Sequence, residues 1–197
     1  MCNSLHSEGM ALEHAILVSL SERAGSGLDL TRRFDRSIGY FWTATHQQIY
    51  RVLARMEADD WVVSEAVAQQ GRPDKKVYAV TDAGRAELRR WLAEPLAHEA
   101  HRSDLAVKLR AASYGDRDRL LEEVSALRAE HATRLALYEQ MEQHDYPDPA
   151  ALSGAELDQY LVLRGGVHLE QFWTRWLTEY LAAHDTAAGA DHERTTS

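Results

Sequence analysis

Hydrophobic and polar positions follow a helical period through much of the first half of the chain. Apolar side chains recur every three or four residues in four segments, which predicts four amphipathic helices. These segments are residues 11–23, 28–38, 43–59 and 81–94. We expect residues 25–27 (GSG) to end the first helix, because glycine-rich stretches interrupt helical periodicity.

A β-hairpin is expected between the third and fourth of these helices. Residues 62–67 and 76–80 are rich in valine and other strand-forming residues, and residues 69–75 (QQGRPDK) have the composition of a turn. Thr43 and Thr81 are predicted to cap the helices that begin beside them. The order helix, helix, helix, hairpin, helix is typical of a winged helix-turn-helix domain.

The second half is predicted to be helical, with a short helix at residues 103–113 and long helices at residues 116–144 and 156–184. The first long helix has a heptad-like apolar seam, and the second has an apolar face too broad for one neighbouring helix to cover. Pairing with a second copy of the chain would bury both, so we expect a homodimer. The residues expected at its interface are Leu120, Val124, Leu127, Leu135, Tyr138, Leu169, Phe172, Trp173 and Trp176.

The expected fold class is therefore mainly α with a small β-hairpin. It comprises a winged helix-turn-helix domain followed by a helical dimerisation domain. The expected boundaries are residues 1–9 for a flexible leader, 10–93 for the DNA-binding domain, 94–102 for a linker, 103–184 for the dimerisation domain and 185–197 for a disordered tail.

Charge is distributed unevenly between the two halves. The net charge is −9, yet residues 10–93 hold 12 Lys and Arg against 11 Asp and Glu, whereas residues 94–197 hold 10 against 19. The first domain is therefore free to approach phosphate, and the acidic second half is repelled by it.

Composition favours a cytoplasmic location. No apolar run approaches the roughly 18 residues that a membrane helix needs. The first nine residues lack the basic and apolar regions of a signal peptide. Cys2 is the only cysteine, so intrachain disulfides are impossible. We expect no membrane association.

The third predicted helix has two different faces at 100° per residue. Ile49, Val52, Leu53 and Met56 gather on the expected buried side. The other side and its flank carry Thr43, Ala44, Gln47, Gln48, Tyr50 and Arg51, with Ala54 and Arg55 beyond them. Glutamine pairs with adenine and arginine with guanine in the major groove, so this face is a candidate for reading DNA. An ordinary solvated helix face is the alternative.

The predicted hairpin tip is basic and rigid. Gly71 permits a turn, Pro73 stiffens it, and Arg72, Lys75 and Lys76 supply positive charge. Such a tip suits a wing that contacts phosphates or a minor groove. Taken alone, it is also compatible with an ordinary charged loop.

Residues 10–92 resemble the PadR family of regulators. The resemblance lies in MALEHAILVSL in the first helix, GYFW before the third, QIYRVLARMEADDWV through the third, and GRPDKKVYAVTDAGRAELRRWL from the wing into the fourth. The second half is similar in architecture to the longer C-terminal helical domain of one PadR branch.

The resemblance implies a dimer with C-terminal helices exchanged between subunits, bound to an inverted-repeat operator in double-stranded DNA. It also implies repression that a small molecule, often aromatic, relieves. Thr43, Gln47, Gln48, Tyr50 and Arg51 would then lie in the recognition helix. Asp74 departs from the family, whose wing often carries a basic residue at this position.

Other functions find less support. The sequence contains no catalytic nucleophile arrangement, phosphate-binding loop or paired catalytic carboxylates, so neither an enzyme nor a cofactor is expected. His98 and His101 are separated by two residues, but no Cys or convergent carboxylate cluster accompanies them, so no metal is expected. His131 and His168 lie on apolar helix faces, as core histidines or as sensors of pH or ligand.

Three further possibilities remain open. Trp42, Trp173 and Trp176 could line an aromatic ligand pocket, although such spacing is commonly found in cores. A winged-helix regulator of another class, such as a MarR-like protein, would have similar DNA-binding heads. A winged-helix adaptor would bind protein in place of DNA.

Overall fold

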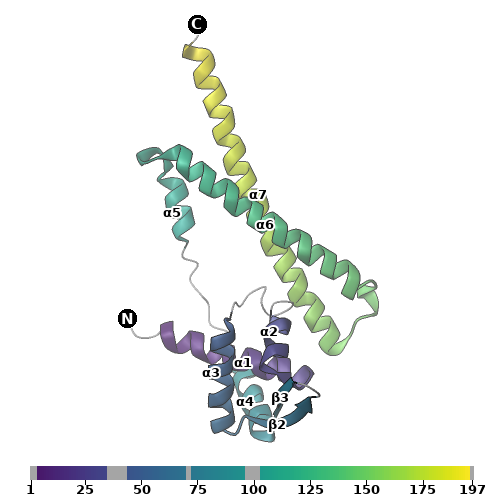
Figure 1. Ribbon diagram of the computed structural model, residues 1–197. Coiled ribbons are helices and arrows are strands. Elements are labelled where there is room, and N and C mark those ends of the chain that lie inside the picture. Colours follow the sequence, from purple (N-terminus) through teal and green to yellow (C-terminus); the bar gives the residue numbers. More distant parts are fainter. Residues whose placement is uncertain (1–3, 35–43, 70–71, 96–102, 196–197) are drawn as a thin grey trace. The chain divides into compact units, whose positions relative to one another are not determined.

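The computed structural model describes residues 4–34, 44–69, 72–95 and 103–195 (Figure 1). The chain divides into two compact units, Met1–His98 and Glu99–Ser197. The predicted linker, residues 94–102, spans this division. None of the described helices is long and apolar enough to cross a membrane.

The described residues of the first unit form four α-helices and a three-stranded antiparallel sheet, as expected for a winged helix. In chain order its elements are α1 (Ser4–Glu22), β1 (Gly25–Ser26), α2 (Gly27–Phe34), α3 (His46–Ala58), β2 (Val62–Gln69), β3 (Arg72–Val80) and α4 (Asp82–Leu92). The strand order is β1-β3-β2. Strand β1 was not expected, because its pairing of Gly25 with Tyr78 joins residues far apart in the sequence.

The core of this unit lies between α1, α2, α3 and the sheet. Its fully buried side chains include Ile16, Leu17, Leu30, Phe34, Ile49, Leu53 and Met56. Each such side chain stabilises the fold by about 1.5–3 kcal/mol through loss of apolar surface from water. The predicted buried face of the third helix is confirmed, since Ile49, Val52, Leu53 and Met56 all lie in this core.

The start of α3 differs from the prediction. Its N-cap is Thr45 and not Thr43, which lies outside the described residues. Thr45 Oγ1 accepts a hydrogen bond from the backbone N–H of Gln48, and Gln48 Oε1 accepts one from the backbone N–H of Thr45. This reciprocal capping box needs Gln or Glu three residues after the cap, and Thr43 has His46 at that position.

The predicted N-cap of α4 is confirmed, and the packing just after it accounts for the glycine in the first turn of this helix. Thr81 caps α4 by accepting a hydrogen bond from the backbone N–H of Gly84. A Cβ atom at Gly84 would lie 2.1 Å from the carbonyl oxygen of Trp61. Gly84 therefore allows α4 to pack directly against the backbone before β2, which offsets the low helix propensity of glycine.

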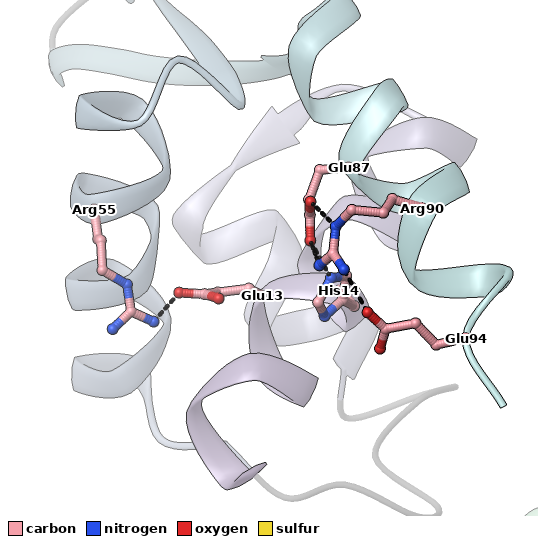
Figure 2. A network of polar contacts seen from close by, with 6 residues as sticks. All are labelled: Glu13, His14, Arg55, Glu87, Arg90 and Glu94. Carbon is pink, nitrogen blue, oxygen red and sulfur yellow. Dashed lines mark hydrogen bonds and ion pairs between the residues drawn. The ribbon is translucent and has the colours of Figure 1, made fainter. Parts of the chain in front are cut away.

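Polar side chains join α1 to α3 and to α4 (Figure 2). Buried His14 places Nε2 3.0 Å from Glu87 Oε1 and stacks on Trp91 with 4.4 Å between ring centroids. The pKa of Glu87 is lowered to about 2, mainly by a hydrogen bond from the Arg90 guanidinium. The contact with His14 lowers this pKa further. Glu13 of α1 pairs with Arg55 of α3. These contacts hold both α3 and α4 against α1.

The second unit is helical throughout its described part. Its elements are α5 (Asp104–Arg110), the short 3₁₀ helix η2 (Ala112–Tyr114), α6 (Arg117–Asp145), a second one, η3 (Pro149–Ala151), and α7 (Gly154–Thr195). Helices α6 and α7 pack against each other (Figure 1). Leu109, Val124 and Leu177 are buried together there.

Both ends of the chain are more helical than predicted. Helix α1 begins at Ser4, inside the expected flexible leader of residues 1–9. Helix α7 continues to Thr195 through the expected disordered tail of residues 185–197. The latter segment contains several alanines and no proline, so its composition supports continuation of a preceding helix even though few apolar residues anchor it.

Candidate nucleic-acid interface

Helix α3 presents polar and aromatic side chains to solvent on the side away from the core. Gln47, Gln48, Tyr50 and Arg51 are exposed, Tyr50 by 48%. Ala44, just before the helix, is half-buried and packs against the core. Gln47 and Arg51 lie one helical turn apart, so both can reach the same short stretch of a bound partner.

Gln48 already has a structural role at the start of α3. Its Oε1 accepts hydrogen bonds from Thr45 N at 2.8 Å and from Thr45 Oγ1 at 3.0 Å. Only the amide NH₂ of this side chain remains for an outside acceptor. Gln47 is therefore the better candidate for a two-point contact with a base.

Tyr50 lies against the start of α2. A Cβ atom at Gly27 would lie only 2.5 Å from Tyr50 Cε1. The absence of a side chain at Gly27 lets the ring cover this helix terminus while remaining half exposed. The sequence contained a glycine signal here but nothing to connect it with Tyr50, which comes more than twenty residues later.

The hairpin extends further than predicted. Residues 69–75 were expected to form a turn, yet β2 reaches Gln69 and β3 starts at Arg72, and these two residues pair. The register shifts before the next pair, Val67 with Lys75, so β3 has one extra residue around Pro73. Proline has no backbone N–H to donate to the neighbouring strand. It is tolerated at a bulge because the ladder of hydrogen bonds is interrupted there. Gly71 lies outside the described residues.

Two of the predicted wing cations are already paired with carboxylates. Lys75 Nζ lies 2.8 Å from Asp29 Oδ2, and Lys76 Nζ lies 2.7 Å from Glu57 Oε2. Hydrogen bonds from Lys75 and from Ser26 hold the pKa of Asp29 well below its usual range. The sequence did not indicate these pairs, because each joins residues that are brought together only by folding.

The residues predicted at the dimer interface differ in how far their side chains are buried within the single chain. Val124 and Tyr138 are buried within the chain itself, whereas Leu169 and Phe172 are 38% and 44% exposed. The other five are half-buried, namely Leu120, Leu127, Leu135, Trp173 and Trp176. An apolar surface on α7 is thus still uncovered in the single chain.

Aromatic side chains gather on α7. The ring of Trp173 lies 5.3 Å from Phe172, 5.4 Å from Trp176 and 5.5 Å from His131 of α6, between centroids. This cluster contains two of the three tryptophans predicted to line a ligand pocket. The third, Trp42, lies outside the described residues.

The two histidines on apolar helix faces have different surroundings. His131 Nδ1 lies 2.5 Å from Oε2 of the buried Glu170, as expected for a core histidine with a partner. His168 is exposed and contacts Arg164 and Gln171, so its predicted core position is wrong. Among the described residues, no group of three or more His, Cys, Asp or Glu is arranged to hold a metal ion.

Two family models match successive parts of the chain. Residues 16–90 match the transcriptional regulator PadR-like family, and residues 101–185 match the model described as virulence activator alpha C-term. A protein of Mycobacterium tuberculosis (strain ATCC 25618 / H37Rv), named as a probable transcriptional regulator, is 56% identical over 184 residues. That match covers 88% of this chain and 97% of the relative.

Solved structures of similar proteins match this chain across both of its units. The Vibrio cholerae virulence activator AphA is 34% identical with a TM-score of 0.74, covering 89% of this chain and 99% of that one. Bacillus subtilis PadR in complex with operator DNA is 26% identical with a TM-score of 0.74, covering 88% and 98%. The same protein in complex with p-coumaric acid gives a TM-score of 0.69, also at 26% identity and covering 88% and 98%.

Proposed function

The chain belongs to the PadR-like family of transcriptional regulators, and from this premise we propose that it binds operator DNA as a homodimer and represses transcription until a small molecule releases it. It acts in the cytoplasm by binding and not by catalysis, and it needs no cofactor. The operator complex of Bacillus subtilis PadR supports DNA as the partner.

The observation that carries this proposal is the exposed side of α3. Gln47, Tyr50 and Arg51 face solvent while Ile49 and Leu53 anchor the opposite side in the core. Helix α3 enters the major groove, where Gln47 reads adenine and Arg51 reads guanine by paired hydrogen bonds. Ala44 and Gln48 lie at the start of this surface and contact the backbone of the duplex beside it. Thr43, outside the described residues, is a further candidate for this contact.

The hairpin acts as the wing. Arg72 and Pro73 begin β3, and Lys75 and Lys76 follow on the same strand. Gly71, outside the described residues, is a further candidate for the wing. Contacts from these residues to phosphates position the protein on the duplex without reading its sequence.

The second unit joins two copies. Leu169, Phe172 and their aromatic neighbours on α7 are covered by the helices of a partner chain. Two α3 helices then meet successive major grooves with centres about 34 Å apart, or a multiple of that distance. The operator is therefore an inverted repeat.

A small aromatic molecule is the proposed effector. The complex of Bacillus subtilis PadR with p-coumaric acid supports this chemical class. Trp173 and Trp176 are the candidate contacts, because stacking on indole rings suits a flat apolar ligand. Binding there changes the spacing of the two heads and releases DNA.

The test is a footprint on the DNA flanking the chain's own gene, followed by competition among operator variants. Gln47→Ala is expected to reduce discrimination at one base position in each half-site by about 1–3 kcal/mol. Gln171→Ala, on the exposed side of α7, is the matched control and leaves discrimination unchanged. If Gln47→Ala discriminated as the wild type does, α3 would not be the reading helix. Failure of the wild type to bind any duplex at about 50 mM salt would favour a protein-binding adaptor.

A further inference from the structure

Two carboxylates hold the lysines that follow the tip of the hairpin. Asp29 belongs to the first turn of α2 and pairs with Lys75, while Glu57 belongs to the last turn of α3 and pairs with Lys76. Lys75 is 35% exposed and Lys76 is 52% exposed, so solvent, and a phosphate, can reach both. In the free protein each lysine is thus neutralised but accessible.

The chain fixes both carboxylates independently of the lysines. Asp29 Oδ2 accepts hydrogen bonds from Ser26 N and Ser26 Oγ, each at 2.9 Å. Glu57 Oε1 accepts one from the hydroxyl of Ser64 on β2. A lysine can leave its carboxylate for another acceptor while the carboxylate remains in place.

We infer that Asp29 and Glu57 set the specificity of DNA binding by competing with phosphate for Lys75 and Lys76. This inference rests on the proposed function. Phosphates of a duplex contact Lys75 and Lys76 only where the DNA backbone lies close enough to replace both carboxylates as their partners. Random duplexes, which make no base contacts with α3, do not hold the wing in that position. Asp29 and Glu57 therefore weaken non-specific binding more than operator binding.

Counterion release makes the idea measurable. Each phosphate that a lysine neutralises steepens the plot of log affinity against log salt by about 0.9. A lysine that must first leave a carboxylate contributes less, because the carboxylate attracts a cation from solution in its place. Removing the carboxylate charge should restore the full contribution.

The experiment compares the full-length wild type with Asp29→Asn and Glu57→Gln on a random-sequence duplex over a series of salt concentrations. Both substitutions keep an oxygen that can accept from Ser26 or Ser64, so the fold is retained. Each variant is expected to bind the random duplex about fivefold more tightly at 100 mM salt, with a slope steeper by up to about 0.9. Affinity for the operator rises less, so the ratio of specific to non-specific affinity falls.

Two controls separate this mechanism from a general change in charge. Glu65→Gln removes one negative charge from β2 of the hairpin that carries both lysines, at a residue without an ion pair to the described part of the chain, and should have little effect. In a Lys75→Met background, Asp29→Asn should no longer tighten binding, because the lysine that it releases is gone.

The outcomes distinguish this inference from the proposed function. Unchanged or weaker binding of random DNA by Asp29→Asn, with normal operator binding by the wild type, would show that the pairs only brace the hairpin. A gain that persists in the Lys75→Met background would also overturn the inference. Absence of DNA binding by the wild type would instead overturn the proposed function.

Discussion

The two units of the chain bury their apolar residues to different degrees. The winged-helix unit encloses Ile16, Leu30, Phe34 and Leu53 almost completely, and the exposed side of α3 is largely polar. The helical unit buries few large side chains and leaves Phe172 and others exposed on α7. The first unit has a closed core and presents polar side chains on the exposed side of α3, whereas the second unit leaves an apolar surface on α7 uncovered.

The two surfaces therefore suit different kinds of partner. Polar, hydrogen-bonding side chains at one-turn spacing suit the base edges of DNA. A contiguous apolar helix face suits a protein surface of the same kind, and a second copy of the chain supplies one. The comparison predicts that damage to the first unit acts on folding, while damage to the second acts on assembly.

The largest effect is expected at Gly84, in the closely packed unit. Gly84→Ala places a methyl group against the backbone of Trp61, which requires α4 to shift and costs about 3 kcal/mol of unfolding free energy. Urea denaturation followed by circular dichroism measures this cost. Gly115→Ala is the control, because its Cβ atom would have no neighbour within 4 Å. Equal stability of the two variants would contradict the close packing described for α4.

The helical unit should respond to a charge on its apolar surface with a change in assembly. Leu169→Glu is expected to raise the dissociation constant of the dimer about 100-fold while helix content is retained, because the charge would be buried at the interface. Analytical ultracentrifugation over a range of concentrations measures this constant. Gln171→Glu, two residues away on an exposed position, should leave it nearly unchanged. A wild type that sediments as a monomer would contradict the comparison of the two units.

Acid should weaken the contact between α1 and α4. The pKa of Glu87 lies at about 2 in the folded chain, below its usual 4.5, so folding favours the ionised form. Its contribution to stability is present above about pH 5 and is lost as the pH falls toward 2. We expect about 1–2 kcal/mol, allowing for solvent screening of the exposed Arg90. The wild type should lose this much more stability than Glu87→Gln between pH 6 and pH 3 in urea titrations, and parallel losses would contradict it.

The smallest effect is expected at the start of α3. Thr45→Ala removes the capping hydroxyl and should cost about 1 kcal/mol of unfolding free energy. Thr45→Ser keeps the hydroxyl and should cost little. Thermal unfolding of the two variants, measured side by side, tests whether Thr45 caps the helix, and a melting temperature equally lowered in both would argue against it.

The order of the elements and the polarity of their faces can be predicted from the sequence. Periodicity placed the buried side of α3, Thr81 marked the start of α4, and charge counts separated the two halves. These features depend on neighbours within about four residues, which the chain displays directly. The N-cap of α3 is also encoded locally, by the Thr45–Gln48 spacing, and does not lie at the predicted Thr43.

Contacts between residues that are distant in the sequence are defined only in the folded structure. It joined Gly25 to Tyr78 in a third strand, laid Tyr50 over Gly27, and gave Lys75 and Lys76 their carboxylate partners. It also exposed His168 while burying the contact of His131 with Glu170. Such contacts depend on how helices and strands pack in space, and a pattern along one element carries no information about what another element places beside it.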